Sequence, residues 1–362
     1  MKKVIKWISI STVAILFVGI ILLVVGFKFG GKFNWYLDFD SKGDKTIAFA
    51  DSPKRVEDNF SLEEFNTIIG DTVSVDLYVV EGDEYKVEYY TYDYHEPKIE
   101  VNNDKLSIKV PHNSVNASFN FEFDDPEYIK VTVPSDKKTY EVEIEGTSGE
   151  TRFEQINVCG KIVLSSGAFK AEGSKAEGDL SVEMTSGECS VKSSEFINLN
   201  VSIASGNVNL EEIVADSLIL YETSGNLNLS GITLTEFANQ GSSGELQIDS
   251  MTCDTFNHNA TSGQLKINSL ECKEFNSIIS SGDVDAKDLK ADKINSEATS
   301  GRTNFEIIGK AEDYGCNLHA VSGMIKFADS DAGNKLVSGE NKDKQIKIDV
   351  TSGDIIIVFV EN

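Results

Sequence analysis

The sequence is poor in the residues and motifs that mark specialised protein classes. Its five cysteines are an odd number spread over 362 residues, and no two form a C-x-x-C pair, which argues against a disulfide framework and a zinc or redox site. Five prolines argue against collagen-like and proline-rich proteins. The four histidines lack a ligand spacing such as H-E-x-x-H, and no G-x-S-x-G, Walker, dinucleotide or calcium-roll motif occurs. We therefore expect no enzyme activity, no catalytic residue, no cofactor and no metal site.

Basic residues are also scarce. The chain has 33 lysines and arginines against 59 acidic residues, for a formal net charge of −26. Such a surface repels phosphate backbones, so nucleic acid is not expected as a partner. It suits a solvated extracellular surface or one that meets cations or basic partners, and it also keeps a protein soluble. The hydrophobic content of 40% is ordinary, so we expect most of the chain to fold.

One long hydrophobic run stands near the start of the chain. Residues 7–27 carry no charge, and a helix of this length extends about 31 Å, enough to cross a bilayer. Lys2, Lys3 and Lys6 make the preceding side slightly more basic than the following side, which favours a cytoplasmic N-terminus. We therefore predict a cytoplasmic tail (1–6), a single transmembrane helix (7–27) in the cell membrane, a linker (28–59) and an extracellular C-terminal part.

A cleaved signal peptide is the alternative for the same run. Its apolar region is normally 7–15 residues long and ends in an A-x-A-like site. The run in this chain is longer, and the residues from Gly26 to Gly31 do not form such a site. The sequence therefore favours an uncleaved anchor.

A tripeptide that ends in Ser-Gly recurs along the rest of the chain. Eleven copies lie between Gly149 and Gly353, and successive glycines are 18, 20, 19, 19, 19, 19, 19, 19, 22 and 30 residues apart. Six consecutive intervals of 19 do not arise by chance and indicate a structural repeat. The most regular corners of this repeat are Ser205, Gly206, Ser224, Gly225, Ser243, Gly244, Ser262, Gly263, Ser281, Gly282, Ser300 and Gly301.

Apolar residues stand at set distances after each glycine, at positions two, four, seven and twelve. After Gly225 these are Leu227, Leu229, Ile232 and Phe237, and the seventh position of successive repeats is Ile213, Ile232, Met251, Leu270, Leu289 and Ile308. The second and fourth positions alternate with polar residues, as in a strand with one buried face. Because one such strand cannot bury this face alone, we predict an all-β fold with a parallel β-solenoid over 147–362, its 19-residue coils stacked about 4.8 Å apart. A helical repeat is the alternative, but its units are usually longer, about 33 to 47 residues.

Residues 60–146 indicate an antiparallel β region. An alternating segment from Thr72 to Val80 ends at the turn Glu81-Gly82-Asp83, and similar segments follow at 86–94, 105–110 and 129–133. We expect this region to cap the first coil, whose open edge would otherwise invite pairing with another chain.

These features together resemble a known family. A hydrophobic N-terminal segment precedes short strands that include Val131-Thr132-Val133-Pro134, and serial Thr-Ser-Gly-x-Val/Leu-x-Leu/Ile coils follow. Over about residues 60–360 the chain resembles the bacterial "putative adhesin" family of domains of unknown function, which includes membrane-anchored proteins linked to cell-envelope stress operons. The resemblance implies an anchored, envelope-exposed β-solenoid without an established activity, and it supplies no catalytic residue.

Three groups of side chains have both a structural and a functional interpretation, and we favour the structural one for each. The corner hydroxyls could bind a polymer such as a cell-wall glycan, but such corners need these residues to satisfy the backbone. Cys253 and Cys272 stand at the same position of adjacent repeats and could form a disulfide or simply fill the core. Alternating aromatic residues could stack on sugars if exposed or form core if buried, namely Tyr90, Tyr92, Tyr94, Phe119, Phe121 and Phe123.

The sequence as a whole predicts a membrane-anchored, adhesin-like interaction protein of the cell surface. We expect a role in envelope maintenance or stress response, with a cell-wall glycan or an envelope protein as partner. Two alternatives stay open. A polysaccharide-active β-helix enzyme would need a groove formed by longer loops. Only the 30-residue interval from Gly323 to Gly353, which contains Asp329 and Asp331, is long enough to supply such a loop. A self-assembling envelope scaffold could form by self-association through an open edge of the apolar strand 355–360.

Overall fold

The computed structural model describes residues 36–39, 45–48, 54–112, 117–118, 126–135, 138–328, 330–339 and 341–361, and these ranges are mostly strand. The only helices in them are two short 3-10 turns, η1 (Asp93–His95) and η2 (Ala311–Asp313). None of the helices in the described ranges has the length and hydrophobicity needed to cross a membrane. The predicted tail (1–6), the predicted transmembrane helix (7–27) and part of the predicted linker (28–59) lie outside the described residues.

The chain divides into two compact units. The smaller unit comprises residues 1–54 and 113–125, and its described part is a three-stranded antiparallel sheet in the order β2 (Lys45–Ala48), β1 (Tyr36–Phe39) and β9 (Ala117–Ser118). The larger unit comprises residues 55–112 and 126–362. All the other strands, and every site discussed below, belong to the larger unit.

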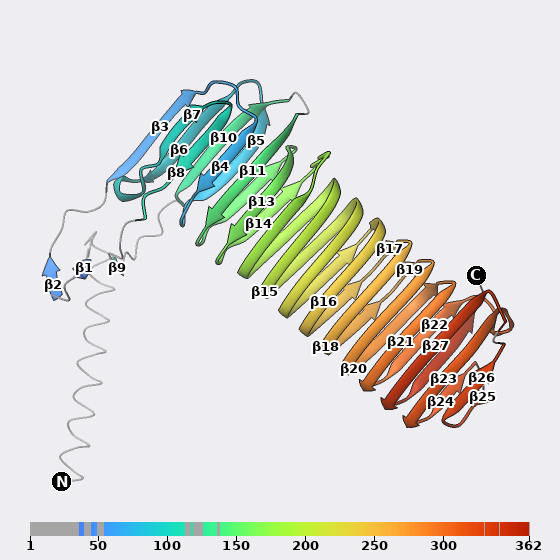
Figure 1. The fold of residues 1–362 in the computed structure, drawn as a ribbon. Helices are drawn as coiled ribbons and strands as arrows, with labels where there is room; N and C mark the ends of the chain where they lie inside the picture. Colours follow the sequence, from blue (N-terminus) through green and yellow to red (C-terminus); the bar gives the residue numbers. More distant parts are fainter. Residues whose placement is uncertain are drawn as a thin grey trace, which may run out of the picture. The chain divides into compact units, whose positions relative to one another are not determined.

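The larger unit is built from coils of chain that stack on one another in parallel (Figure 1). Phe237 pairs with Leu218 of the coil before it and with Phe256 of the coil after it, so each step along the stack is 19 residues. The predicted solenoid-like repeat is therefore confirmed. Its strands are β11 (Thr139–Gly146), β12 (Glu150–Glu154), β13 (Asn157–Leu164), β14 (Ala168–Glu172), β15 (Leu180–Ser230), β16 (Ile232–Ile248), β17 (Met251–Thr252), β18 (Thr255–Ile267), β19 (Leu270–Glu271), β20 (Glu274–Lys290), β21 (Lys293–Ser300), β22 (Thr303–Ile308), β23 (Tyr314–Ser322), β24 (Ile325–Phe327), β27 (Lys344–Ser352) and β28 (Ile355–Val360).

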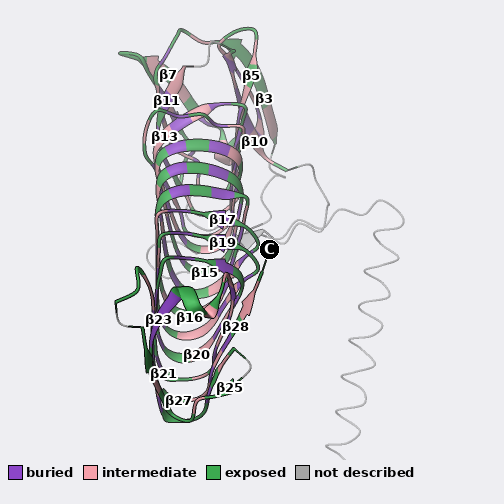
Figure 2. Cartoon of the chain, turned by 90° about the vertical axis from the view of Figure 1, so that its right-hand side faces the viewer, coloured by how far each residue is buried: buried purple, intermediate pink, exposed green. Residues whose placement is uncertain are grey.

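The interior of the stack is apolar because the same positions of the repeat point inward in every coil. Figure 2 shows buried residues alternating with more exposed ones along the strands. Leu227, Leu229 and Phe237 are each at most 1% exposed, as their positions in the repeat predict. Like side chains lie on like: the rings of Phe256 and Phe275 stack with centroids 5.1 Å apart. This column of stacked, fully buried side chains is the main source of stability expected for the fold.

One predicted inward residue is misplaced in the last regular coil. The register between β20 and β22 shifts after Ala286, so that Leu289 pairs with Ile307. Ile307 is fully buried, whereas Ile308, the residue at the predicted seventh position, is only half-buried. The prediction for Ile308 is wrong because this coil is one residue shorter there, and a one-residue shift exchanges the two faces of a strand.

The region 60–146 contains parallel as well as antiparallel strands. β4 (Thr67–Asp71) and β5 (Asp76–Gly82) pair in parallel with β11 and β12, so they form one more coil that lacks the Ser-Gly corner. β8 (Lys105–Lys109) and β10 (Tyr128–Pro134) also lie parallel to β4 and β5. The antiparallel strands come last, with β7 (Lys98–Asn102) on β8, β6 (Lys86–Tyr92) on β10 and β3 (Arg55–Ser61) on β6. The prediction of an antiparallel region is therefore wrong for the strands nearest the coils.

The order of the coils in space departs from their order in sequence at the C-terminal end. β27 lies between β21 and β23, and β28 pairs with both β22 and β24. The last coil of the chain is thus inserted between two earlier ones, with Ser352 paired to both Ser300 and Ser322. The long interval before it supplies β25 (Ser330–Asp331) and β26 (Lys335–Ser338), which pair antiparallel with β24 and β23.

This insertion changes the expectation for the apolar strand 355–360. β28 pairs with β22 along its whole length, and Ile355–Ile357 also pair with β24 on the other side. The predicted open edge is therefore wrong for the first half of the strand. Self-association stays a prediction, but the whole of this strand cannot provide the edge for it.

Candidate functional site

The predicted corner residues form one continuous ladder along the stack. Ser224, Ser243, Ser262, Ser281 and Ser300 pair in register from coil to coil. From Gly206 to Gly301, each corner glycine packs against the carbonyl oxygen of the corner glycine in the previous coil. A Cβ on Gly263 would collide with that oxygen, and its φ of +121° also disfavours any side chain. The glycines of the ladder are therefore required by backbone packing.

The corner hydroxyls have a mixed role. Ser262 Oγ donates a hydrogen bond to the carbonyl oxygen of Ser242 at 3.2 Å, which is the backbone-satisfying role favoured from the sequence. In contrast, the side chains of the other serines in the ladder face solvent, namely Ser205, Ser224, Ser243, Ser281 and Ser300. The ladder thus offers a row of hydroxyl groups on the surface of the stack.

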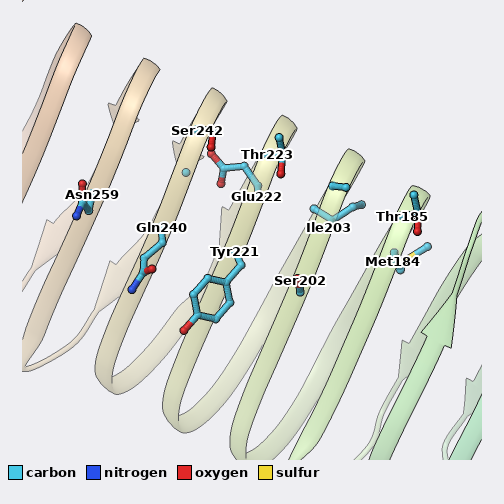
Figure 3. Close-up of a pocket in the computed structure, with 12 residues that line it drawn as sticks. Met184, Thr185, Ser202, Ile203, Tyr221, Glu222, Thr223, Gln240, Ser242 and Asn259 are labelled. Carbon is cyan, nitrogen blue, oxygen red and sulfur yellow. The ribbon is translucent and has the colours of Figure 1, made fainter.

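Beside this ladder a groove of about 480 Å³ crosses five neighbouring coils (Figure 3). Tyr221 and Gln240 are paired residues of adjacent coils in its wall, and Tyr221 is 44% exposed. Figure 3 shows Glu222 reaching toward the neighbouring coil that carries Ser242. Glu222 is the only charged side chain in the lining, and the neutral polar ones are Thr185, Ser202, Thr223, Gln240, Ser242 and Asn259.

Glu222 occupies a position that the repeat otherwise gives to apolar residues. The residue 16 positions after the glycine in other coils is buried and apolar: Ile203, Ala260, Ile279 and Ala298. The coil next to Glu222 has Gly241 at this position, and a Cβ there would collide with Oε1 of Glu222. Gly241 therefore leaves the room in which the carboxylate lies, and Glu222 is only 9% exposed.

Two polar residues connect Glu222 to the interior of the stack. Asn239 Nδ2 donates a hydrogen bond of 2.8 Å to Glu222 Oε2, and His258 Nδ1 lies 2.8 Å from Asn239 Oδ1. Because Asn239 turns its N–H groups to the carboxylate, its oxygen is the acceptor and His258 Nδ1 carries the proton. His258 Nε2 is then a bare acceptor, buried without a hydrogen-bond partner in the described part of the chain.

Asn239 and His258 belong to a column that changes from apolar to polar and back. In spatial order this column is Leu220, Asn239, His258, Ser277, Ser296, Ile348 and Leu318. The hydroxyls of Ser277 and Ser296 are also buried with no partner among the described residues. An unsatisfied buried polar group costs about 1–3 kcal/mol, so this column destabilises the stack relative to an apolar one.

Burial shifts the ionisation of both titratable groups in this network. Desolvation raises the pKa of Glu222, and the hydrogen bond from Asn239 offsets this rise only in part. Desolvation lowers the pKa of His258 to about 4, so the imidazole is neutral at neutral pH. Glu222 Oε1 accepts no hydrogen bond from the described residues, so a donor that enters the groove would stabilise the carboxylate.

The two cysteines in adjacent coils are free thiols in the structure. Cys253 is 4% and Cys272 is 7% exposed, and both fill the interior as small side chains. A hydrogen bond with Cys253 and burial together raise the pKa of Cys272 far above its usual value. Such a thiol is rarely ionised, which makes it a poor nucleophile.

The tyrosine stripe of β6 and the turn after it is neither core nor an open platform. Tyr90, Tyr92 and Tyr94 are half-buried, and the rings of Tyr92 and Tyr94 stack 5.4 Å apart. The Arg55 guanidinium lies 4.5 Å from the ring centroid of Tyr90 and 3.8 Å from that of Tyr92. Because the ring faces are covered in this way, the stripe anchors β3 to β6. Phe119, Phe121 and Phe123 lie outside the described residues.

The remaining histidines each pair with a single carboxylate. His95 lies 2.9 Å from Glu127, and similar pairs join His112 to Asp71 and His319 to Asp349. Within the described ranges, no three His, Cys, Asp or Glu residues lie close enough together to hold a metal ion. Asp331 is exposed in β25, and Asp329 lies outside the described residues.

Glu222, Asn239, Gly241 and His258 were not predicted as site residues from the sequence. The signal was present in the repeat itself. At position 16 after the glycine, Glu222 and Gly241 replace apolar residues, and at position 14 the apolar residue of earlier coils gives way to Asn239, His258, Ser277 and Ser296. Comparing the coils with one another, rather than searching for catalytic motifs, would have found these residues.

Solved structures resemble this chain at low sequence identity. A structure titled "putative adhesin" from Bacteroides fragilis is 15% identical, covers 85% of this chain and 98% of its own, and has a TM-score of 0.34. A "putative lipid binding protein" from Parabacteroides distasonis is 17% identical over 70% of this chain and 95% of its own, with a TM-score of 0.38. A "putative cell adhesion protein" from Clostridium sporogenes is 13% identical, covers 85% of this chain and 100% of its own, and has a TM-score of 0.22.

The family assignment comes from the sequence. No curated protein matches the chain significantly. The family model Toastrack DUF4097 matches residues 136–212 and 192–358, which together span more than half of the chain and most of the stacked coils. The chain therefore belongs to the Toastrack DUF4097 family, in agreement with the resemblance noted in its repeats.

Proposed function

We propose that this chain is a single-pass membrane protein that displays its solenoid on the cell surface and binds other components of the cell envelope. The uncharged run 7–27, preceded by Lys2, Lys3 and Lys6, supports an anchor with a cytoplasmic N-terminus. Membership of the Toastrack DUF4097 family supports an adhesin-like role, which we place in envelope maintenance or the response to envelope stress.

The observation that carries this proposal is the repetition of polar side chains along the outer face of the stack. Asn228 donates to Asn209 at 3.0 Å, Asn276 to Asn257 at 3.0 Å, and Asn295 to Asn276 at 2.8 Å. Equivalent polar groups therefore recur in several successive coils, about 4.8 Å apart. Such a surface suits an extended partner that itself repeats, because one mode of contact serves many coils.

The charge of the chain restricts the partner. A net charge of −26 repels polyanions, so the partner is neutral or basic. A neutral cell-wall glycan or a basic region of an envelope protein meets this requirement.

We propose a binding role and not a catalytic one. Glycoside hydrolysis generally uses two carboxylates that flank the scissile bond. Glu222 is the only carboxylate in the groove lining, and the hydrogen bond from Asn239 fixes one of its oxygens. This groove therefore has the chemistry to hold a ligand but not the pair of acids that most glycosidases need.

The first experiment tests the membrane topology of the full chain in two ways. Protease treatment of intact cells should remove the part after residue 28 and spare a cytoplasmic tag placed at the N-terminus. Deleting residues 7–27 should abolish the recovery of the protein with membranes. Protection of the solenoid in intact cells, or unchanged membrane recovery after the deletion, would contradict the topology.

The second experiment measures binding. The full chain in detergent should sediment with isolated cell-wall material or co-purify with a cross-linked envelope protein. A chain that reaches the surface and yet retains neither kind of material would contradict the binding role.

A further inference from the structure

The departures from the repeat cluster in one place. The interior position that holds Glu222 is apolar in other coils, and the neighbouring coil has a glycine there. The interior position that holds Asn239 and His258 is occupied by Leu220 in the coil before them. These four residues lie in three successive coils, and hydrogen bonds join three of them. The polar column continues beyond them as Ser277 and Ser296.

These exceptions are unfavourable for folding. A carboxylate that is nine-tenths buried loses hydration, and a single amide hydrogen bond replaces only part of it. Gly241 loses more backbone entropy on folding than the alanine that other coils have at this position. Local conflicts of this kind in an otherwise regular protein are expected where a function needs them.

The lining of the groove indicates which ligand chemistry fits. The lining has no lysine, arginine or histidine to attract an anion. It offers neutral hydroxyl and amide groups from successive coils, an exposed aromatic ring at Tyr221 and the free Oε1 of Glu222. A sugar chain has apolar faces for an aromatic ring, many hydroxyl donors for a carboxylate and amides, and a repeat of its own.

We infer that the groove is a binding site for a neutral oligosaccharide that lies across the coils, with Tyr221 against a sugar face and Glu222 Oε1 accepting a sugar hydroxyl. This inference rests on the proposed function and names the partner class for one part of the surface. Asn239 and His258 are positioning residues, because they hold the carboxylate without lining the groove. Thr223 and Ser242, the residues just before two serines of the corner ladder, extend the same row of hydroxyls into the site.

The test is calorimetric titration of the full chain in detergent with chitotetraose and cellotetraose, and with tetralysine as a cationic probe. The wild-type chain should bind a tetrasaccharide and not tetralysine. Tyr221→Ala and Glu222→Gln should each weaken tetrasaccharide binding by about tenfold or more, since each removes one main contact. Circular dichroism and thermal unfolding of both variants will show that the fold is retained.

The repeat supplies matched controls. Ile278 and Glu297 stand 15 positions after the glycine, like Tyr221, but do not line the groove. Ile278→Ala and Glu297→Gln should therefore change the tetrasaccharide affinity by less than about twofold. Equal losses in the control variants would overturn the inference, as would tetralysine binding in place of the sugars.

Failure of this inference can be told apart from failure of the proposed function. If Tyr221→Ala and Glu222→Gln sediment with cell-wall material as well as the wild type does, the groove is not the site but the binding role stands. If the chain is not at the cell surface, the proposed function fails, whereas tetrasaccharide binding by the purified protein still tests the groove. If no tetrasaccharide binds the folded wild type, the inference is wrong.

Discussion

Two columns of side chains run through the same coils, two residues apart in the chain, yet differ in kind. Phe237, Phe256 and Phe275 form a fully buried stack with ring centroids 4.9 and 5.1 Å apart. Two residues later in the same coils stand Asn239, His258 and Ser277, equally buried but polar. Because each interior position recurs in successive coils, its contributions to stability add up along the stack. An apolar residue there stabilises each coil, and a polar residue destabilises it. The aromatic column therefore stabilises the fold, whereas the polar column does not, and its presence needs a reason other than stability.

The largest effect is expected from breaking the aromatic column. Phe256→Ala should lower the free energy of unfolding by about 3–5 kcal/mol, because it leaves a cavity between two stacked rings. Chemical denaturation of the full chain measures this loss. Phe60→Ala is the control, since Phe60 is 36% exposed, and it should cost under about 1 kcal/mol. Similar losses for the two variants would contradict the role given to the column.

The corner ladder is the next most sensitive feature. Gly263→Ala should destabilise the chain by about 3 kcal/mol, because its Cβ meets the Gly244 carbonyl oxygen and its φ is +121°. Gly333→Ala separates these two causes, since Gly333 has a φ of +74° with nothing within 4 Å of a Cβ. Because only backbone strain acts in Gly333→Ala, its free energy of unfolding should fall by about 1 kcal/mol. Equal losses would mean that close packing of the corners contributes nothing.

The polar column should make stability depend on pH through His258. The pKa of His258 is about 4 in the folded chain, against about 6.5 for an unperturbed histidine, so protonation favours the unfolded state. The stability due to neutral His258 is complete above pH 6.5 and falls by up to about 3 kcal/mol as the pH drops to 4. Unfolding curves at pH 7.5 and pH 4.5 measure this fall.

His258→Leu isolates this contribution, because Leu220 already occupies the same column. Subtracting its pH profile from that of the wild type removes the contributions of all groups that the two proteins share. Identical profiles for the two proteins would show that His258 is hydrated in solution.

A smaller effect is expected at Glu222. Because burial raises the pKa of Glu222, its ionised form is favoured more strongly in the unfolded chain than in the folded one. The stability that protonated Glu222 contributes is therefore present below the ordinary glutamate pKa of 4.5 and is lost as the pH rises through the folded pKa. Glu222→Gln keeps an acceptor for Asn239 and should raise stability at pH 8 by about 1 kcal/mol, with no gain at pH 4. Glu297→Gln is the exposed control, and a drop in stability for Glu222→Gln would contradict the argument.

The smallest effect is expected at the end of the polar column. Ser296→Ala removes a buried hydroxyl that has no partner in the described part of the chain and should raise stability by about 0.5–1 kcal/mol. Ser300→Ala, on the exposed ladder, should leave thermal unfolding unchanged. A loss of stability in Ser296→Ala would show that its hydroxyl is satisfied in solution.

The regular part of the fold could be predicted from the sequence because every coil repeats one hydrophobic pattern. The pattern identified Leu227, Leu229, Ile232 and Phe237 as interior residues, and the structure buries all four. It failed at Ile308, where one residue is missing from the coil, and at strand 355–360, which is inserted between two earlier coils. Both failures concern how one coil fits on another, which a pattern read along the chain does not contain.

The groove could not be predicted from the sequence either, and the reason is similar. Tyr221, Gln240 and Asn259 are unremarkable in sequence and form a surface only because coils 19 residues apart are neighbours. The space around Glu222 depends on a missing side chain at Gly241 in the next coil. Comparing the repeats marks Glu222 and Gly241 as exceptions, but only the stacking seen in the structure brings them and the groove residues together as one surface.

The most direct test restores the repeat in the coils that depart from it. A variant that carries Glu222→Ile, Asn239→Leu, Gly241→Ala and His258→Leu gives each position a residue that other coils already have there. If the polar residues are kept for ligand binding, this variant should unfold at a higher temperature than the wild type and should no longer bind a neutral tetrasaccharide. Retained binding, or a lower unfolding temperature, would contradict the view that these residues form a site maintained against the stability of the stack.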